Sequence, residues 1–179
     1  MARIEIILGP MFSGKSTELI RRCSRYEAIG KKVQIFNHAI DTRCGDDEIS
    51  THSHSTLRTK ATKLTKLLSA KLDPMPDDIG IDEAQFFEDL FDFVQFVEKY
   101  DVVVIIAGLD GDYMRRPFGQ ILRCVPYCDE VVKLTAMCSA TKDGTPGIFT
   151  KKITEQDIDV VSVGAGEKFA AMCRAKYLE

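Results

Sequence analysis

Hydrophobic and polar positions along this chain alternate with the periods of strands and helices. Residues 4–8 form a short apolar run that predicts a first strand, and residues 15–28 carry apolar side chains at helical spacing among several arginines. Gly30 is placed to end this helix, and residues 33–36 predict a second strand. Strand, loop, helix and strand in this order form the start of a βαβ unit.

The alternation continues through the middle of the chain. Residues 79–81 predict a short strand, and apolar side chains at helical spacing follow over residues 86–97. Residues 102–107 are apolar without interruption, which is typical of a strand covered by helices on both faces. Three further elements, two strands and a closing helix, are predicted at residues 130–135, 159–163 and 167–177. We therefore expect an α/β fold with a mainly parallel sheet flanked by helices.

Two long polar stretches interrupt this pattern, at residues 38–55 and 139–156. Long loops in a compact domain are usually functional, so both are candidates for substrate lids, although a plain surface insertion explains either one alone nearly as well. Because the alternation of strands and helices weakens after Ala136, we expect a principal domain over residues 1–136 and a smaller one over residues 137–179.

With 179 residues, 45% of them hydrophobic and 28% charged, the chain has the composition of a globular protein that can build its own core. Its net charge of -3, from 24 basic and 27 acidic residues, argues against binding nucleic acid or a membrane surface through bulk charge. No apolar run approaches the ~20 residues of a membrane span, and the N-terminal run is too short for a signal peptide. We therefore expect a cytoplasmic or nuclear protein whose six cysteines are free thiols or metal ligands rather than disulfides.

A phosphate-loop motif, G-x-x-x-x-G-K-[ST], lies between the first predicted strand and helix. Its glycines allow successive N–H groups to turn toward a phosphate, Lys15 reaches the β and γ oxygens, and the Ser16 hydroxyl is a candidate Mg²⁺ ligand. A chance glycine-rich turn is the alternative, but the strand and helix on either side favour nucleotide binding. The candidate phosphate-binding residues are Gly9, Pro10, Met11, Phe12, Ser13, Gly14, Lys15, Ser16 and Thr17.

An acidic pair, Asp82 and Glu83, follows the predicted strand at residues 79–81. Alone, such a pair is more often a solvated turn. After a buried strand, in a chain that already has a phosphate loop, Asp82 is the expected second Mg²⁺ ligand. Glu83 is then a candidate general base that accepts the proton of an attacking hydroxyl.

Several aromatic side chains near predicted strand ends or loops are candidates for stacking on a base. They are Phe86, Phe87, Tyr113 and Phe118. For Phe87, as for Phe93 and Val94, packing in the core is the favoured interpretation.

Other polar side chains have no single interpretation. Arg115 and Arg116 are equally consistent with a phosphate lid and with solvated charges. His38, His52 and His54 lack cysteine partners at zinc spacing, so we expect them to be solvated or to form local hydrogen bonds.

Together with three further segments, these motifs make the chain resemble the cytosolic, type II thymidine kinases from residue 4 to residue 177. The further segments are Asp41-Thr42-Arg43, Leu109-Asp110-Gly111 and Arg116-Pro117-Phe118. The most specific similarities are residues 9–19 and the Asp-Glu-x-Gln-Phe-Phe run at residues 82–87. A switch GTPase would need an Asn-Lys-x-Asp motif, which the chain lacks, and a non-catalytic nucleotide-binding regulator could dispense with Glu83.

The resemblance implies ATP- and Mg²⁺-dependent transfer of the γ-phosphoryl group to the 5′-hydroxyl of thymidine or deoxyuridine. It implies that Glu83 is the catalytic base, that Lys15 and Arg43 are also catalytic, and that a lasso-like subdomain over residues 137–179 closes over the nucleoside. It further implies a homotetramer inhibited by thymidine triphosphate, with no nucleic-acid or membrane partner. The nucleoside-binding residues that it implies are Met11, Asp41, Phe86, Leu109, Tyr113, Phe118, Thr150, Val160, Ser162 and Phe169.

The chain departs from this family in two places. Phe169 stands where the family has a tyrosine. The family's structural zinc is held by two Cys-x-x-Cys pairs, and the matching positions here are Cys138 with Thr141 and Cys173 with Lys176. With only two of four ligands, we expect zinc to be absent. The alternative is that Cys124 and Cys128 replace the missing ligands.

Overall fold

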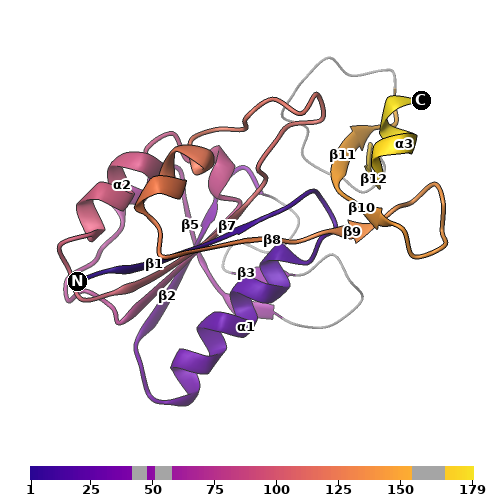
Figure 1. Ribbon diagram of the computed structural model, residues 1–179. Coiled ribbons are helices and arrows are strands. Elements are labelled where there is room, and N and C mark those ends of the chain that lie inside the picture. The colour runs from indigo at the N-terminus through magenta and orange to yellow at the C-terminus, as the bar shows by residue number, and fades with distance from the viewer. Residues whose placement is uncertain (42–47, 51–57, 155–167) are drawn as a thin grey trace.

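A six-stranded sheet forms the centre of the molecule. The structure is a computed structural model that describes residues 1–41, 48–50, 58–154 and 168–179 (Figure 1). The strands run in the order β5-β2-β6-β7-β1-β8, and all five neighbouring pairs are parallel. Their bounds are β1 Arg3–Leu8, β2 Val33–His38, β5 Thr62–Leu64, β6 Asp78–Asp82, β7 Val103–Gly108 and β8 Glu130–Lys133. The predicted α/β fold with a mainly parallel sheet is confirmed.

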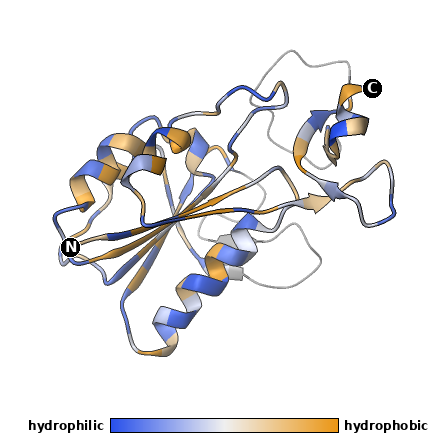
Figure 2. Ribbon diagram, in the orientation of Figure 1, coloured by the Kyte–Doolittle hydropathy of each residue, from blue (hydrophilic) through white to orange (hydrophobic). Residues whose placement is uncertain are grey.

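Helices cover both faces of this sheet, as Figure 1 shows. The period of two along β1 places Ile7 against α1 (Lys15–Ala28), whereas Ile6 packs on the side of α2 (Leu90–Val97). Three short 3₁₀ helices add to the molecule: η1 Leu67–Ser69, η2 Ala84–Phe86 and η3 Ile121–Tyr127. The hydrophobic residues gather along the strands and the inner faces of the helices (Figure 2). None of the described helices, of which α1 with 14 residues is the longest, could cross a bilayer.

The core confirms several predictions made for single side chains. Phe87, Phe93 and Val94 are fully buried. His38 is the last residue of β2, and its ring packs against Phe87 at 4.8 Å between centroids. The predicted local hydrogen bond is present, because the N–H of Ile40 donates to Nδ1 of His38 at 3.2 Å. Solvation of His38 was the wrong alternative, since the ring is half-buried and burial lowers its pKa.

Beyond β8 the chain forms two small antiparallel pairs and a short helix. The elements are β9 Ala136–Met137, β10 Pro146–Gly147, β11 Phe149–Lys152, β12 Phe169–Met172 and α3 Arg174–Leu178. β9 pairs with β10, and β11 pairs with β12. Two predictions were therefore wrong: residues 139–154 do not form one long loop, because β10 and β11 lie within them, and the helix predicted at residues 167–177 begins only at Arg174. Pairing with β11 holds residues 169–172 extended, although two of the four are alanines.

The first polar stretch also contains regular structure. β3 (Glu48–Ser50) pairs antiparallel with β4 (Arg58–Lys60). The strand predicted at residues 159–163, like His52 and His54, lies outside the described residues.

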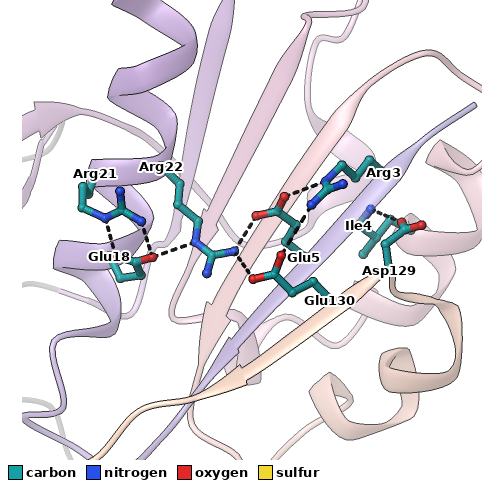
Figure 3. A network of polar contacts seen from close by, with 8 residues as sticks. All are labelled: Arg3, Ile4, Glu5, Glu18, Arg21, Arg22, Asp129 and Glu130. Carbon is teal, nitrogen blue, oxygen red and sulfur yellow. Dashed lines mark hydrogen bonds and ion pairs between the residues drawn. The ribbon is translucent and has the colours of Figure 1, made fainter.

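A network of charges ties α1 to two strands of the sheet (Figure 3). Nη1 of Arg22 bonds to Glu5 on β1 and to Glu130 on β8, and Nε of Arg22 donates to Glu18 at 2.8 Å. Hydrogen bonds from Arg21 and Arg22 lower the pKa of Glu18 to about 2 despite its partial burial. The side chains of Arg22 and Glu5 are only 12% and 8% exposed, so solvent screens this pair less than a surface pair. The network fixes the helix whose first turn follows the phosphate loop.

Candidate active site

The phosphate-loop residues join β1 to α1, as the motif predicts. At Gly9, φ is 150°, and a Cβ atom would lie 2.6 Å from the carbonyl oxygen of Leu134, so only glycine fits there. Gly14 is the N-cap of α1 and has the left-handed φ of 81°. Phe12 adopts φ 65°, an uncommon conformation for a residue with a side chain. These turns direct the chain into the positive N-terminal end of a 14-residue helix.

Hydrogen bonds hold the loop together and connect it to β11. Nζ of Lys15 and Oγ of Ser13 both donate to the carbonyl oxygen of Pro10, at 2.7 and 2.8 Å. The N–H of Met11 donates to Oγ1 of Thr150 at 3.0 Å, and Thr150 is buried. The structure therefore joins a candidate phosphate-binding segment to a candidate nucleoside-binding residue that lies 139 positions later in the chain.

Acidic residues lie at the carboxyl ends of the neighbouring strands β2 and β6. Asp82, the last residue of β6, is 2% exposed and is the register partner of Asn37 on β2. Nδ2 of Asn37 donates to Oδ2 of Asp41 at 2.9 Å, and both residues are buried. Ligands bind preferentially at the carboxyl ends of parallel strands, which is also where β1 enters the phosphate loop.

The donor set at this edge fits a magnesium ion. A serine hydroxyl at position 16, in the first turn of α1, and the Asp82 carboxylate supply the oxygen ligands that Mg²⁺ prefers. Within the described part of the chain, no three His, Cys, Asp or Glu side chains form a metal-binding group.

Glu83 follows β6 directly and has a left-handed backbone, with φ 51° and ψ 40°. A non-glycine residue in this conformation costs on the order of 1–3 kcal/mol, and such strain clusters at functional sites. Nε2 of Gln85 donates to Oε2 of Glu83 at 2.6 Å. Sequence reasoning missed Gln85 as a functional residue, although the Asp-Glu-x-Gln-Phe-Phe run contains it.

The candidate nucleoside-binding residues come together in pairs. The rings of Phe86 and Phe118 meet edge to face with centroids 5.5 Å apart, and those of Tyr113 and Phe169 lie 6.2 Å apart. The N–H of Leu109, directly after β7, donates to the side chain of Gln85. Two further nucleoside-binding candidates, Val160 and Ser162, and the catalytic candidate Arg43 lie outside the described residues.

Asp112 organises the loop that carries Tyr113 and Phe118, and sequence reasoning missed it. Its carboxylate accepts hydrogen bonds from the N–H groups of Met114 and Arg116 and from Nε of Arg116, at 2.7–2.9 Å. Arg115 lies over the ring of Tyr177 at 4.5 Å. Arg115 and Arg116 therefore both contact other residues of the protein. Neither the phosphate-lid interpretation nor the solvated-charge interpretation included these contacts. An aspartate beside a glycine, at a turn between apolar segments, is the only sequence signal that could have pointed to this residue.

The positions that match the family's zinc ligands do not fit zinc. The N–H of Cys173 donates to Sγ of Cys138 at 3.2 Å, so the two surviving cysteines do lie together. Nζ of Lys176 lies 2.7 Å from the Glu179 carboxylate, and an ammonium cannot ligate a cation. The fourth position is a threonine hydroxyl, whereas structural zinc sites use four Cys or His ligands.

Cys124 and Cys128, the alternative ligands, lie in the core and away from Cys138 and Cys173 in the described structure. Cys124 and Cys128 belong to the hydrophobic core on the α2 side of the sheet. Their sulfur atoms contact the carbonyl oxygens of Gln120 and Val125. The five described cysteines are free thiols, as predicted.

A phosphate loop before a helix, and an acidic pair at the end of another parallel strand of the same sheet, define an α/β phosphate-loop protein of the nucleotide-binding class. The chain belongs to the thymidine kinase family, because the family model for thymidine kinase matches residues 2–177.

Individual relatives are similar over nearly the whole chain. It is 38% identical to the thymidine kinase of monkeypox virus over 177 residues, which is 98% of this chain and 97% of the viral protein. It is 38% identical to the human protein named thymidine kinase, cytosolic, over 99% of this chain and 74% of the human protein. The corresponding chicken protein is 37% identical over 99% of this chain and 77% of its own length.

Proposed function

We propose that this protein transfers the γ-phosphoryl group of ATP to the 5′-hydroxyl of thymidine, and also of deoxyuridine. The observation that supports this most directly is the meeting of two motifs in a chain of the thymidine kinase family. The phosphate loop after β1 and the Asp82-Glu83 pair after β6 lie at the same edge of a parallel sheet. Phosphoryl transfer needs this combination of a phosphate cradle, a metal ligand and a base.

Each of these groups has a separate task in the proposed reaction. The backbone N–H groups of residues 9–17 and the ammonium of Lys15 hold the phosphates and stabilise the negative charge of the transferred group. Ser16 and Asp82 would hold Mg²⁺, which neutralises charge on the phosphate oxygens when it is bound. Glu83 accepts the proton of the attacking 5′-hydroxyl. Arg43 is proposed to act on the phosphates by its resemblance to the family alone.

The nucleoside is proposed to lie between the two aromatic pairs. Phe86 lies in η2 after β6 and Phe118 in the loop after β7, whereas the contact between Tyr113 and Phe169 connects that loop to β12. Aromatic pairs of this kind offer flat apolar surface on which a pyrimidine stacks. A phenylalanine at position 169 keeps the ring of the family's tyrosine but offers no hydroxyl.

Three further properties are proposed from the resemblance. They are a homotetrameric assembly, inhibition by thymidine triphosphate and, because the similar human protein is named cytosolic, a cytoplasmic location.

An assay with labelled ATP and the natural nucleosides tests this function. Thymidine and deoxyuridine should be converted to their 5′-monophosphates. Lys15→Ala should weaken ATP binding and lower turnover together, because the ammonium serves both the ground state and the transition state. An active preparation in which Lys15→Ala leaves both quantities unchanged would contradict the phosphate-loop assignment.

A further inference from the structure

The side chain of Gln85 joins two parts of the candidate active site. Gln85 lies in η2, between β6 and α2, and is 3% exposed. Its Nε2 donates to Oε2 of Glu83 at 2.6 Å, and its Oε1 accepts a hydrogen bond from the N–H of Leu109 at 2.9 Å. Both ends of one amide are thus used, one on the proposed base and one on the backbone at the end of β7.

The chemistry of the two partners fixes the orientation of this amide. A backbone N–H can only donate, so the oxygen of Gln85 must face Leu109 and the NH₂ group must face Glu83. A carboxylate accepts a hydrogen bond from an NH₂ group, and its negative charge strengthens that bond. Glutamate at position 85 would keep the acceptor for Leu109 but lose the donor for Glu83, and methionine would lose both.

Two glycines leave the space that Gln85 occupies. A Cβ atom at Gly108 would lie 2.7 Å from Oε1 of Gln85. A Cβ atom at Gly119, where φ is 61°, would lie 2.1 Å from the carbonyl oxygen of Gln85. Neither approach could be relieved without moving the amide or the backbone of η2. Gly108 thus packs closely against the side chain of Gln85, and Gly119 packs closely against its main chain.

We propose that Gln85 is a positioning residue that orients the Glu83 carboxylate for the proton transfer. The inference rests on the proposed function, in which Glu83 is the base. The left-handed backbone at Glu83 sets where the side chain starts, but it leaves the side-chain torsions open. The hydrogen bond from Gln85 fixes one carboxylate oxygen and thus the plane of the group. The same amide also bonds to the backbone of Leu109, a proposed nucleoside contact. Gln85 therefore keeps the Glu83 carboxylate and the proposed nucleoside-binding loop in a fixed position relative to each other.

Two substitutions separate the two hydrogen bonds of Gln85. Gln85→Glu keeps an oxygen for Leu109 but sets a second carboxylate against Glu83, whereas Gln85→Met removes both bonds at nearly constant length. Both variants should lower kcat about 10- to 100-fold, the loss expected for a misplaced catalytic group. The KM for ATP should stay unchanged, since the phosphate loop is not touched.

Gln120→Met is the matched control. Oε1 of Gln120 accepts a hydrogen bond from the N–H of Phe91 at 2.8 Å, and this bond lies at the start of α2 rather than at Glu83. Its loss should lower the unfolding midpoint about as much as Gln85→Met does, with kcat unchanged. If kcat fell in Gln120→Met as much as in Gln85→Met, in proportion to the loss of stability, the inference would be overturned.

A double-mutant cycle with Glu83→Ala, measured by single-turnover transfer from labelled ATP, gives the decisive comparison. If Gln85 acts through Glu83, Gln85→Met should slow the wild-type protein but have no further effect in Glu83→Ala. An equal additional loss in the Glu83→Ala background would overturn the role of Gln85 while leaving Glu83 as the base. Wild-type turnover in Glu83→Ala itself would overturn the assignment of the base and, with it, any action of Gln85 through that group.

Discussion

Asp78 is a buried acid whose replacement should stabilise the protein above neutral pH. It is the first residue of β6 and is fully buried, and apart from the Cys23 thiol neither of its carboxyl oxygens has a hydrogen-bond partner within the described residues. Burial raises its pKa from 3.8 to about 7, and the charges of Glu5 and Glu27 add to this effect. The neighbouring Cys23 thiol opposes it, and burial raises the pKa of Cys23 in turn.

The sign and size of the effect follow from proton binding. The folded protein holds the Asp78 proton more tightly than the unfolded chain does, so stability is fully present below pH 3.8 and is lost as the pH rises to about 7. Each unit of pKa difference corresponds to ~1.4 kcal/mol, so the total loss is ~4 kcal/mol in the free energy of unfolding. Asp78→Asn removes the ionisable group at nearly the same volume. The variant should therefore be the more stable protein at about pH 8 and close to the wild type at about pH 4.

Urea unfolding over a series of pH values measures this difference. Asp77→Asn is the control on the preceding residue, because the side chain of Asp77 is 40% exposed and a hydrogen bond from Lys32 lowers its pKa. The contribution of Asp77 has the opposite sign: it is present above pH 3.8 and disappears as the pH falls. If the difference between wild type and Asp78→Asn stayed constant from about pH 4 to about pH 8, the argument from burial would be refuted.

Three further predictions concern the site and the small subdomain. Glu83→Gln should lower turnover by roughly 10²–10⁴ while ATP still binds, as measured by titration and steady-state kinetics, and wild-type turnover would exclude Glu83 as the base. Hydrogen exchange over residues 139–156 should slow when thymidine binds, and deoxyguanosine should be neither bound nor phosphorylated; unchanged exchange would contradict closure of this segment. Elemental analysis of protein purified without chelator should find far less than one zinc per chain; one tightly held zinc that Cys138→Ser removes would show that other residues complete the site.

The sequence predicted the elements whose pattern depends on local periodicity. The boundaries of α1 agree with the prediction, because they depend on local signals: the apolar spacing within the helix, the glycine turn before it and Gly30 after it. The phosphate loop and the acidic pair could be found because their chemistry requires fixed residue types at fixed spacing. The buried strand β7 (Val103–Gly108) could also be predicted, because its apolar run is recognisable without knowing which strands lie beside it.

Features that depend on distant partners could not be predicted in this way. β12 contains two alanines, which favour helix, and only its pairing with β11 makes it a strand. Gln85 was recognisable as part of a motif, but its task depends on Leu109, 24 residues further on. The carboxylate of Asp112 likewise organises its loop through hydrogen bonds to Met114 and Arg116, and no periodic pattern in the sequence predicts these bonds.

Contacts of α3 connect the C-terminal elements to the loop that carries Tyr113. The hydroxyl of Tyr177 donates to the carbonyl oxygen of Tyr113 at 2.7 Å, and the guanidinium of Arg115 lies over the rings of Tyr177 and Phe149 at 4.5 and 5.3 Å. Each such cation-π contact contributes about 0.5–2 kcal/mol, depending on its exposure. All of them converge on the loop that carries Tyr113, which in turn faces Phe169 on β12. These contacts therefore act on a proposed nucleoside-binding residue, so that the packing of α3 and β12 and the formation of the proposed nucleoside pocket depend on the same side chains.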